Sequence, residues 1–147
     1  MTEAALEKRV CVRFRIPGAT VKYKREKRFL RKADYIEEFC PVLDLSRGGI
    51  RFLSQEMIKF ESLVELKISI PGETTPLVLK GLVRWYSPNP GQSYRYQLGV
   101  QFLPYGESKD HNYPGALTKI IALEQKFMDD STPLGAPPGS PKEEFEI

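Results

Sequence analysis

Residues that build metal sites and catalytic triads are scarce in this sequence. Its 147 residues include one histidine, His111, and two cysteines, Cys11 and Cys40. The cysteines are widely spaced and form neither a CxxC motif nor the disulfide framework of a small secreted protein, so we expect two reduced thiols. A triad or a zinc site would have to be built without a second imidazole. We therefore expect no metal, no cofactor and no enzymatic activity.

Long apolar runs are also missing. The longest apolar stretches are only a few residues, whereas about 18 are needed to span a bilayer. The start of the chain, "MTEAALEKRV", does not have the pattern of a signal peptide. We expect a cytoplasmic protein that does not insert into a membrane. The length, with 41% apolar and 28% charged residues, is typical of one globular domain.

Positive charge is concentrated in the first third of the chain. Residues 1–51 hold 13 Lys/Arg and 7 Asp/Glu, while residues 52–147 hold 9 and 12. Within the basic part, "KYKREKRFLRK" (22–32) carries seven positive charges and one Glu. Such a density attracts phosphates and other anions, although a solvated strand and loop can have the same composition.

The patterns that are present are mainly those of β-strands. Six segments alternate apolar and polar residues or are rich in strand-forming residues: 19–24, 39–45, 49–53, 63–70, 77–86 and 94–103. "SPNPGQS" separates the last two, and its prolines and glycine predict a loop. Six short strands at this spacing favour an all-β fold, a six-stranded antiparallel closed β-barrel, over a sheet covered by helices.

One helix is expected after the strands, over about 116–130. Apolar residues recur there at helical spacing and form one stripe that only Glu124 interrupts; its members are Leu117, Ile120, Ile121, Phe127 and Met128. We expect Leu117, Ile121 and Phe127 to pack on the barrel mouth or on a second subunit, which leaves a homodimer open. The chain then divides into a flexible N-terminal arm (1–18), a barrel with its helix (19–130) and a disordered tail rich in Pro, Gly and Ser (131–147).

Two short motifs flank the first predicted strand. Arg9 and Arg13 form an RxxxR motif in the arm, and Asp44, Ser46 and Gly49 form a DxSxxG motif at a turn between strands. Each motif alone is weak, because both occur by chance in many sequences. In this order, followed by "LVLKGLVRW", "YQLGVQF" and the C-terminal helix, the chain resembles the PilZ domain family over about residues 8–128.

The resemblance implies a non-catalytic receptor for cyclic di-GMP, a bacterial second messenger. Guanidinium groups suit this ligand because they bind phosphate, the O6 and N7 edge of guanine, or the face of a base. Arg9 and Arg13 would close over it with the arm. Asp44 would accept hydrogen bonds from guanine N1–H and N2–H₂, Ser46 would donate to N7 or phosphate, and Gly49 would let the ligand approach the backbone. Further candidate contacts are Lys8, Arg15 and Arg47.

Each of these residues also has a purely structural interpretation. Arg9 and Arg13 can be solvated residues of the arm. Asp44 and Ser46 can stabilise the turn with their side chains, and the Gly48–Gly49 pair can supply positive φ angles. Trp85 is expected in the core or the barrel wall rather than as a base-stacking platform.

Two other functions compete with messenger binding. A small barrel can bind single-stranded nucleic acid through the basic run and the rings of Tyr23, Phe29 or Tyr35; we expect this ligand less than the messenger. A PilZ-like scaffold that has lost ligand affinity is the second, and the intact motif residues argue against it. For a receptor, we expect an unidentified protein partner to receive the signal.

Overall fold

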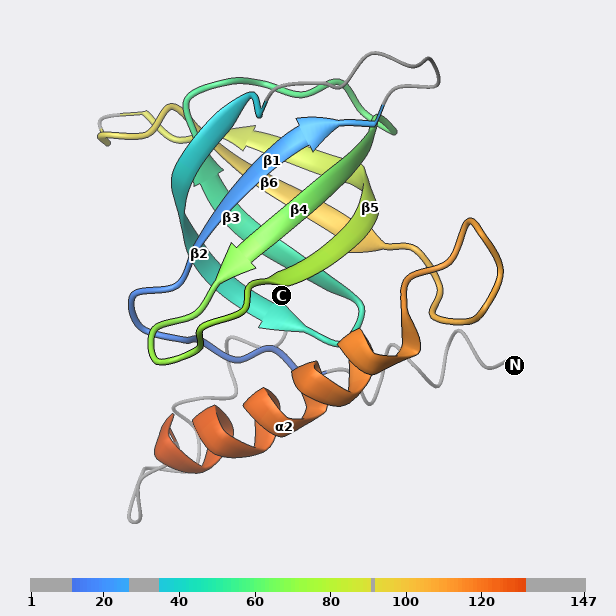
Figure 1. The fold of residues 1–147 in the computed structure, drawn as a ribbon. Coiled ribbons are helices and arrows are strands. Elements are labelled where there is room, and N and C mark those ends of the chain that lie inside the picture. Colours follow the sequence, from blue (N-terminus) through green and yellow to red (C-terminus); the bar gives the residue numbers. More distant parts are fainter. Residues whose placement is uncertain (1–11, 27–34, 91, 132–147) are drawn as a thin grey trace.

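The structure, a computed structural model, describes residues 12–26, 35–90 and 92–131, with side chains as far as Met128 (Figure 1). Within these residues the chain forms six strands followed by one helix. Their bounds are Thr20–Arg25 (β1), Glu37–Ser46 (β2), Gly49–Ser54 (β3), Leu63–Ser69 (β4), Leu77–Pro88 (β5), Tyr96–Phe102 (β6) and Pro114–Ser131 (α2). Each expected element overlaps an observed one, and the bounds differ by a few residues.

The strands form a closed barrel in the order β1-β2-β3-β6-β5-β4. All neighbouring strands are antiparallel, and β4 pairs with β1 to complete the circle. The expected six-stranded antiparallel closed barrel with a C-terminal helix is confirmed. Closure leaves no free strand edge on the circumference, so ligands and partners meet the side chains of the outer wall or the two ends.

Alternation along each strand separates the core from the outer wall, because successive side chains point to opposite faces of a strand. On β4, Val64, Leu66 and Ile68 are almost fully buried in the barrel, while the residues between them are partly exposed. The same pattern buries Val21 and Tyr23 of β1. The charged residues of these strands therefore lie on the outer wall.

An irregularity in β5 decides where the single tryptophan points. Leu77, Leu79 and Val83 face the core in strict alternation, which would also turn residue 85 inward. The pairing with β6 shifts between Val83 and Trp85, so that Trp85 lies opposite Gly99. A bulge of this kind re-aims the side chains that follow it. Trp85 is thus part of the outer barrel wall and is 37% exposed.

Helix α2 lies across the end of the barrel at which the turn between β2 and β3 is found (Figure 1). Its buried face consists of Ala116, Ile120 and Leu123. Leu117 and Ile121, which we expect from the sequence to pack on the barrel mouth, are only half-buried. The contact face runs through Ile120 of the same stripe and is rotated toward Leu123. Phe127 and Met128 are partly buried and pack against the core. No helix among the described residues has the length and apolar character to span a bilayer.

The described part of the expected N-terminal arm, residues 12–18, packs against the barrel. Phe14 and Ile16 are buried. Phe14 and Leu45 of β2 exchange two backbone hydrogen bonds of 2.9 Å each, so Phe14 forms an isolated bridge beside the strand. The sequence also predicts a flexible start of the arm and a disordered tail. Both segments, residues 1–11 and 132–147, lie outside the described residues.

Candidate functional site

The turn between β2 and β3 carries the DxSxxG motif. Ser46 and Gly49 are the last paired residues of the hairpin. The Ser46 hydroxyl accepts a hydrogen bond from the Gly48 amide at 3.2 Å and donates one to the Gly49 carbonyl at 3.4 Å. Ser46 is also buried. Its side chain therefore stabilises the turn in this structure, and its contact with a ligand stays a prediction.

The glycine of the motif is required by strand packing. A Cβ on Gly49 would lie 2.5 Å from the carbonyl oxygen of Val100 on β6, far inside van der Waals contact. Neither Gly48 nor Gly49 has a positive φ; among the described glycines only Gly18 and Gly72 do. The suggestion that the pair supplies positive φ angles is therefore wrong. Gly49 instead lets β3 approach β6 closely.

Asp44 lies between two arginines on the outer wall. Its Oδ1 accepts a hydrogen bond from Arg13 Nη1 at 3.0 Å. Arg51 Nε lies 3.1 Å from Oδ1 and 2.9 Å from Oδ2, and Arg51 Nη2 also donates to Oδ2. Asp44 is only 5% exposed because these groups cover its carboxylate. The arginine–aspartate cluster, Arg13, Asp44 and Arg51, thus has one negative and two positive charges, and its net positive charge attracts anions.

Each member of the cluster is positioned by backbone pairing. Asp44 lies directly opposite Arg51 in the register of β2 and β3. The bridge between Phe14 and Leu45 fixes Arg13 beside them, since it places the arm next to the residue that follows Asp44. The hydrogen bonds from Arg51 to Asp44 raise the pKa of the Arg51 guanidinium, so this group stays charged at every physiological pH.

Residues paired across neighbouring strands extend from Asp44 around the barrel. Arg51 lies opposite Gly99 of β6, and Gly99 lies opposite Trp85 of β5. A Cβ on Gly99 would be 2.4 Å from the Trp85 ring, so the indole lies directly over this glycine. Four neighbouring strands of the wall therefore carry, in sequence, a carboxylate covered by arginines, an accessible guanidinium and an aromatic surface. Such a row combines groups that can bind a nucleotide through ion pairing, through hydrogen bonds to the edge of a base and through stacking.

Arg47, a further candidate contact, faces α2. Its Nε donates to Glu124 Oε1 at 2.9 Å and its Nη2 to Glu124 Oε2 at 3.4 Å. The Tyr105 hydroxyl donates to the Arg47 carbonyl at 2.7 Å. The turn of the motif is therefore connected to the helix that covers the end of the barrel.

The other sequence-predicted site residues are not brought into this geometry. Arg15 is exposed on the arm, while Arg9 and Lys8 lie outside the described residues. Sequence analysis did not identify Arg51. A two-residue turn between residues 46 and 49 would have revealed it, because that register pairs residue 45 with 50 and residue 44 with 51.

Comparison with known families and solved structures agrees with this barrel architecture. The family model for the PilZ domain matches residues 7–112. The chain therefore belongs to the PilZ domain family, whose members are binding and effector domains.

One similar solved structure is the Bacillus subtilis inhibitor of motility, MotI/DgrA. The TM-score is 0.56 at 16% sequence identity, with 84% of this chain and 53% of that protein covered. This chain thus spans about half the length of that protein, and at this identity the likeness concerns the fold alone. No curated protein matches the sequence.

Proposed function

We propose that this protein is a cytoplasmic receptor for cyclic di-GMP and that the arginine–aspartate cluster is the centre of its site. Membership of the PilZ family supports a ligand of this class, and the placement of Asp44 between Arg13 and Arg51 on the outer wall carries the assignment of the site. A cyclic dinucleotide brings two phosphates and two guanines. The cluster offers two guanidiniums and a carboxylate to complement them.

The members of the arginine–aspartate cluster have different roles toward the ligand. Arg13 and Arg51 attract a phosphate or the O6 and N7 edge of guanine, while Asp44 accepts from the guanine N1–H and N2–H₂. Adenine has no such pair of donors, so Asp44 gives selectivity for guanine. In the absence of ligand the same carboxylate holds both arginines in place and neutralises one of their two charges, so one net positive charge is left for an anionic ligand.

Ligand binding is coupled to the arm through Arg13. Arg13 lies in the arm just before the anchored Phe14, and its side chain contacts Asp44 of the barrel, so a ligand that replaces this contact changes how the arm is held ahead of Phe14. Arg9, four residues earlier, would add a third guanidinium to the site, the second one from the arm. The rearranged arm then presents a changed surface to a protein partner, and no catalytic step is involved.

Single-stranded nucleic acid is less well supported as the ligand. Tyr23, one of the three aromatic residues considered for base stacking, is fully buried in the barrel. Lysine ammonium groups lie over the Tyr35 ring. Phe29 lies outside the described residues. Two of the three stacking candidates are thus not free to take a base.

Calorimetric titration with cyclic di-GMP, cyclic di-AMP and GTP tests the proposal. We expect cyclic di-GMP to bind with a dissociation constant between submicromolar and roughly 10 μM, about −7 to −9 kcal/mol, as a few charge-assisted contacts reduced by ordering of the arm would give. Cyclic di-AMP should bind at least about tenfold more weakly. Equal affinity for the two cyclic dinucleotides would overturn the role of Asp44, and no binding of either would overturn the receptor function.

A further inference from the structure

Three lysine side chains gather around one aromatic ring on the outer wall formed by β1 and β4. The ammonium nitrogens of Lys22, Lys24 and Lys67 lie 4.6, 5.1 and 5.8 Å from the centroid of the Tyr35 ring. Attraction between each ammonium and the π-electrons partly offsets the repulsion among the three charges. We call these four residues the lysine cluster.

Strand register brings the cluster together. Lys22 of β1 lies opposite Lys67 of β4, and Lys24 follows Lys22 on the same face. Within the described residues, none of the three lysines forms an ion pair with a carboxylate. Tyr35 is uncharged, so it orients the ammonium groups without neutralising them. The cluster consequently keeps a positive potential that a partner of opposite charge can use.

Carboxylates border this positive area. Glu65 of β4 lies opposite Lys24. The pairing of β1 with β2 shifts between Val21 and Tyr23, so Lys22 faces two residues of β2, and one of them is Glu38. Glu26, just beyond β1, contacts Lys80 at 3.8 Å. The positive area is therefore small, and a long uniform polyanion placed across it would also meet negative charge.

We propose that the lysine cluster docks a short acidic segment of a partner protein in an extended conformation. Side chains on one face of an extended segment repeat every second residue, about 7 Å apart, and Lys22 and Lys24 have the same spacing because they are also two residues apart on a strand. Two carboxylates of such a segment can thus pair with the two lysines of β1. A third can reach Lys67.

Two features of the wall favour an acidic peptide over a nucleic acid or a bilayer. The Tyr35 ring is already occupied by ammonium groups and does not provide a stacking surface, on which single-strand binding relies. The bordering carboxylates would repel a continuous phosphate backbone or an anionic membrane surface. A short segment with a few carboxylates avoids both of these penalties.

The lysine cluster is separate from the arginine–aspartate cluster. In the closed strand order, β1 is opposite β6 and β4 is opposite β3, and Figure 1 shows β1 and β4 in front of β3 and β6. A partner on this wall would leave the side chain of Arg51 accessible. The inference therefore does not depend on which ligand binds the arginine–aspartate cluster.

The test uses the full chain labelled with ¹⁵N and a ten-residue peptide that alternates Glu and Thr, at about 0.15 M salt so that weak long-range attraction is screened. We expect amide shifts to concentrate at residues 22–24, 35 and 65–67. The variant Lys22→Gln, Lys24→Gln, Lys67→Gln should bind the peptide roughly tenfold more weakly, as the loss of a few exposed ion pairs would give. Its thermal midpoint should not fall, because the change relieves repulsion.

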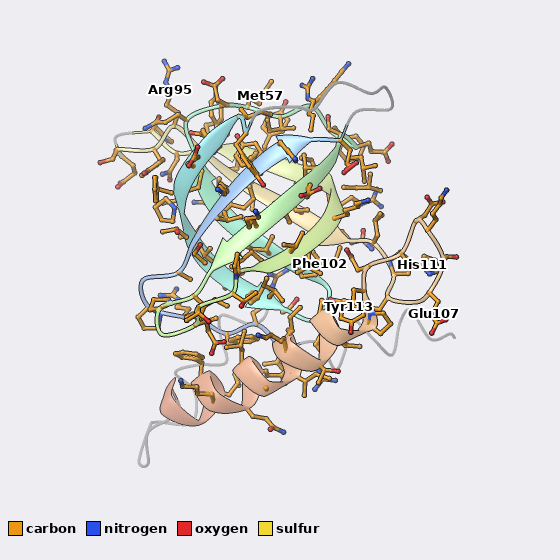
Figure 2. All side chains as sticks on the ribbon, in the orientation of Figure 1. Met57, Arg95, Phe102, Glu107, His111 and Tyr113 are labelled. Carbon is orange, nitrogen blue, oxygen red and sulfur yellow. The ribbon has the colours of Figure 1, made fainter. Side chains whose placement is uncertain are left out.

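A matched control removes the same charge elsewhere. Lys59, Arg95 and Lys109 are exposed, and Arg95 projects from the barrel end opposite α2 (Figure 2). Changing all three to Gln should weaken peptide binding less than about twofold. Equal losses in the two triple variants would overturn the proposal. So would tighter, cluster-dependent binding of a ten-nucleotide oligothymidine, or of vesicles with phosphatidylglycerol, than of the peptide.

Discussion

Arg47, in the turn between β2 and β3, donates from two of its nitrogens to the two carboxylate oxygens of Glu124 on α2, with Nε 2.9 Å from Oε1. Glu124 is the one charged residue in the otherwise apolar stripe of the helix. Its side chain is 13% exposed, whereas that of Arg47 is 38% exposed. This pair explains why a carboxylate interrupts the stripe: it connects the helix to the turn that carries the motif.

The pair should contribute measurably to docking of the helix. We expect Glu124→Gln and Arg47→Gln each to lower the free energy of unfolding. A double-mutant cycle should give a coupling of about 1 kcal/mol, a value reduced from that of a buried pair because Arg47 is partly solvated. Urea denaturation of the four proteins measures it. A coupling of zero would mean that α2 is held by its apolar face alone.

Arginine geometry should matter more to messenger binding than the charge of the basic run. Arg13→Lys should lose at least about tenfold in affinity for cyclic di-GMP, because an ammonium cannot replace a planar, forked guanidinium. The quadruple neutralisation of Lys24, Arg25, Lys27 and Arg28 should lose less. Calorimetry of the variants gives the order, with Arg95→Lys as an unaffected control.

The dependence of affinity on salt provides an independent check of the same prediction. If the arginines engage about two phosphates, a plot of log affinity against log salt concentration should have a shallow slope, about −2 or closer to zero. A nucleic-acid strand that contacts six or more phosphates should give a slope of about −4 or steeper. If the quadruple variant loses more affinity than Arg13→Lys, the basic run is the binding site.

On α2, replacing a more deeply buried side chain by alanine should lower the free energy of unfolding by more. Ile120 is fully buried, so Ile120→Ala should destabilise the protein by about 2–5 kcal/mol. Leu117→Ala is the matched control, since Leu117 is half-buried one helical turn earlier, and it should cost less than half as much. Replacing a fully buried phenylalanine by alanine costs about 3 kcal/mol or more. Phe127 is partly exposed, so Phe127→Ala should cost less than that. Thermal and urea melts that rank Leu117 above Ile120 would contradict the orientation of the helix.

Gly99 should be intolerant of a side chain because Trp85 covers it. Gly99→Ala places a methyl group 2.4 Å from the indole, so the ring must move, at a cost of about 1–3 kcal/mol. The fluorescence of this single tryptophan should change with it. In a Trp85→Phe background the same substitution should cost less. An equal cost in both backgrounds would show that the clash is with the backbone instead.

Stability should fall at alkaline pH through two buried groups that share one acceptor. The Tyr23 hydroxyl donates to Glu37 Oε1 at 2.9 Å, and the Cys40 thiol lies 3.7 Å from the same oxygen. Burial, together with the charge of Glu37, raises the pKa of both groups well above their ordinary values of 10.0 and 9.0. Both therefore stay protonated in the folded protein when they ionise in the unfolded chain.

The sign of the effect follows from this difference. The stability contributed by the neutral Cys40 thiol is complete below about pH 9 and declines above it, by about 1.4 kcal/mol per pH unit. In Cys40→Ala the decline should begin about one pH unit higher, where Tyr23 ionises in the unfolded chain. Denaturation curves from pH 7 to 10.5 measure both proteins. A constant difference between them over this range would contradict the assignment.

Much of the architecture was determined by local sequence. The alternation of Val64, Leu66 and Ile68 with polar residues specifies a half-buried strand, because side chains two apart share a face. Helical spacing of the apolar residues specifies α2, and its one proline is at the first position, where a helix tolerates it. The two motifs identify the family from residue types and order alone, since each type has a chemical role that few others can fill.

Tertiary structure alone decided which side chains meet. Arg13 meets Asp44 because the arm packs beside β2, Trp85 faces outward because of a bulge, and Lys67 joins Lys22 although the two are 45 positions apart. Periodicity says which face a residue occupies on its own element, but register, bulges and the rotation of α2 are set by how the elements pack together. That packing is a collective minimum over residues distant in sequence, and no local pattern contains it.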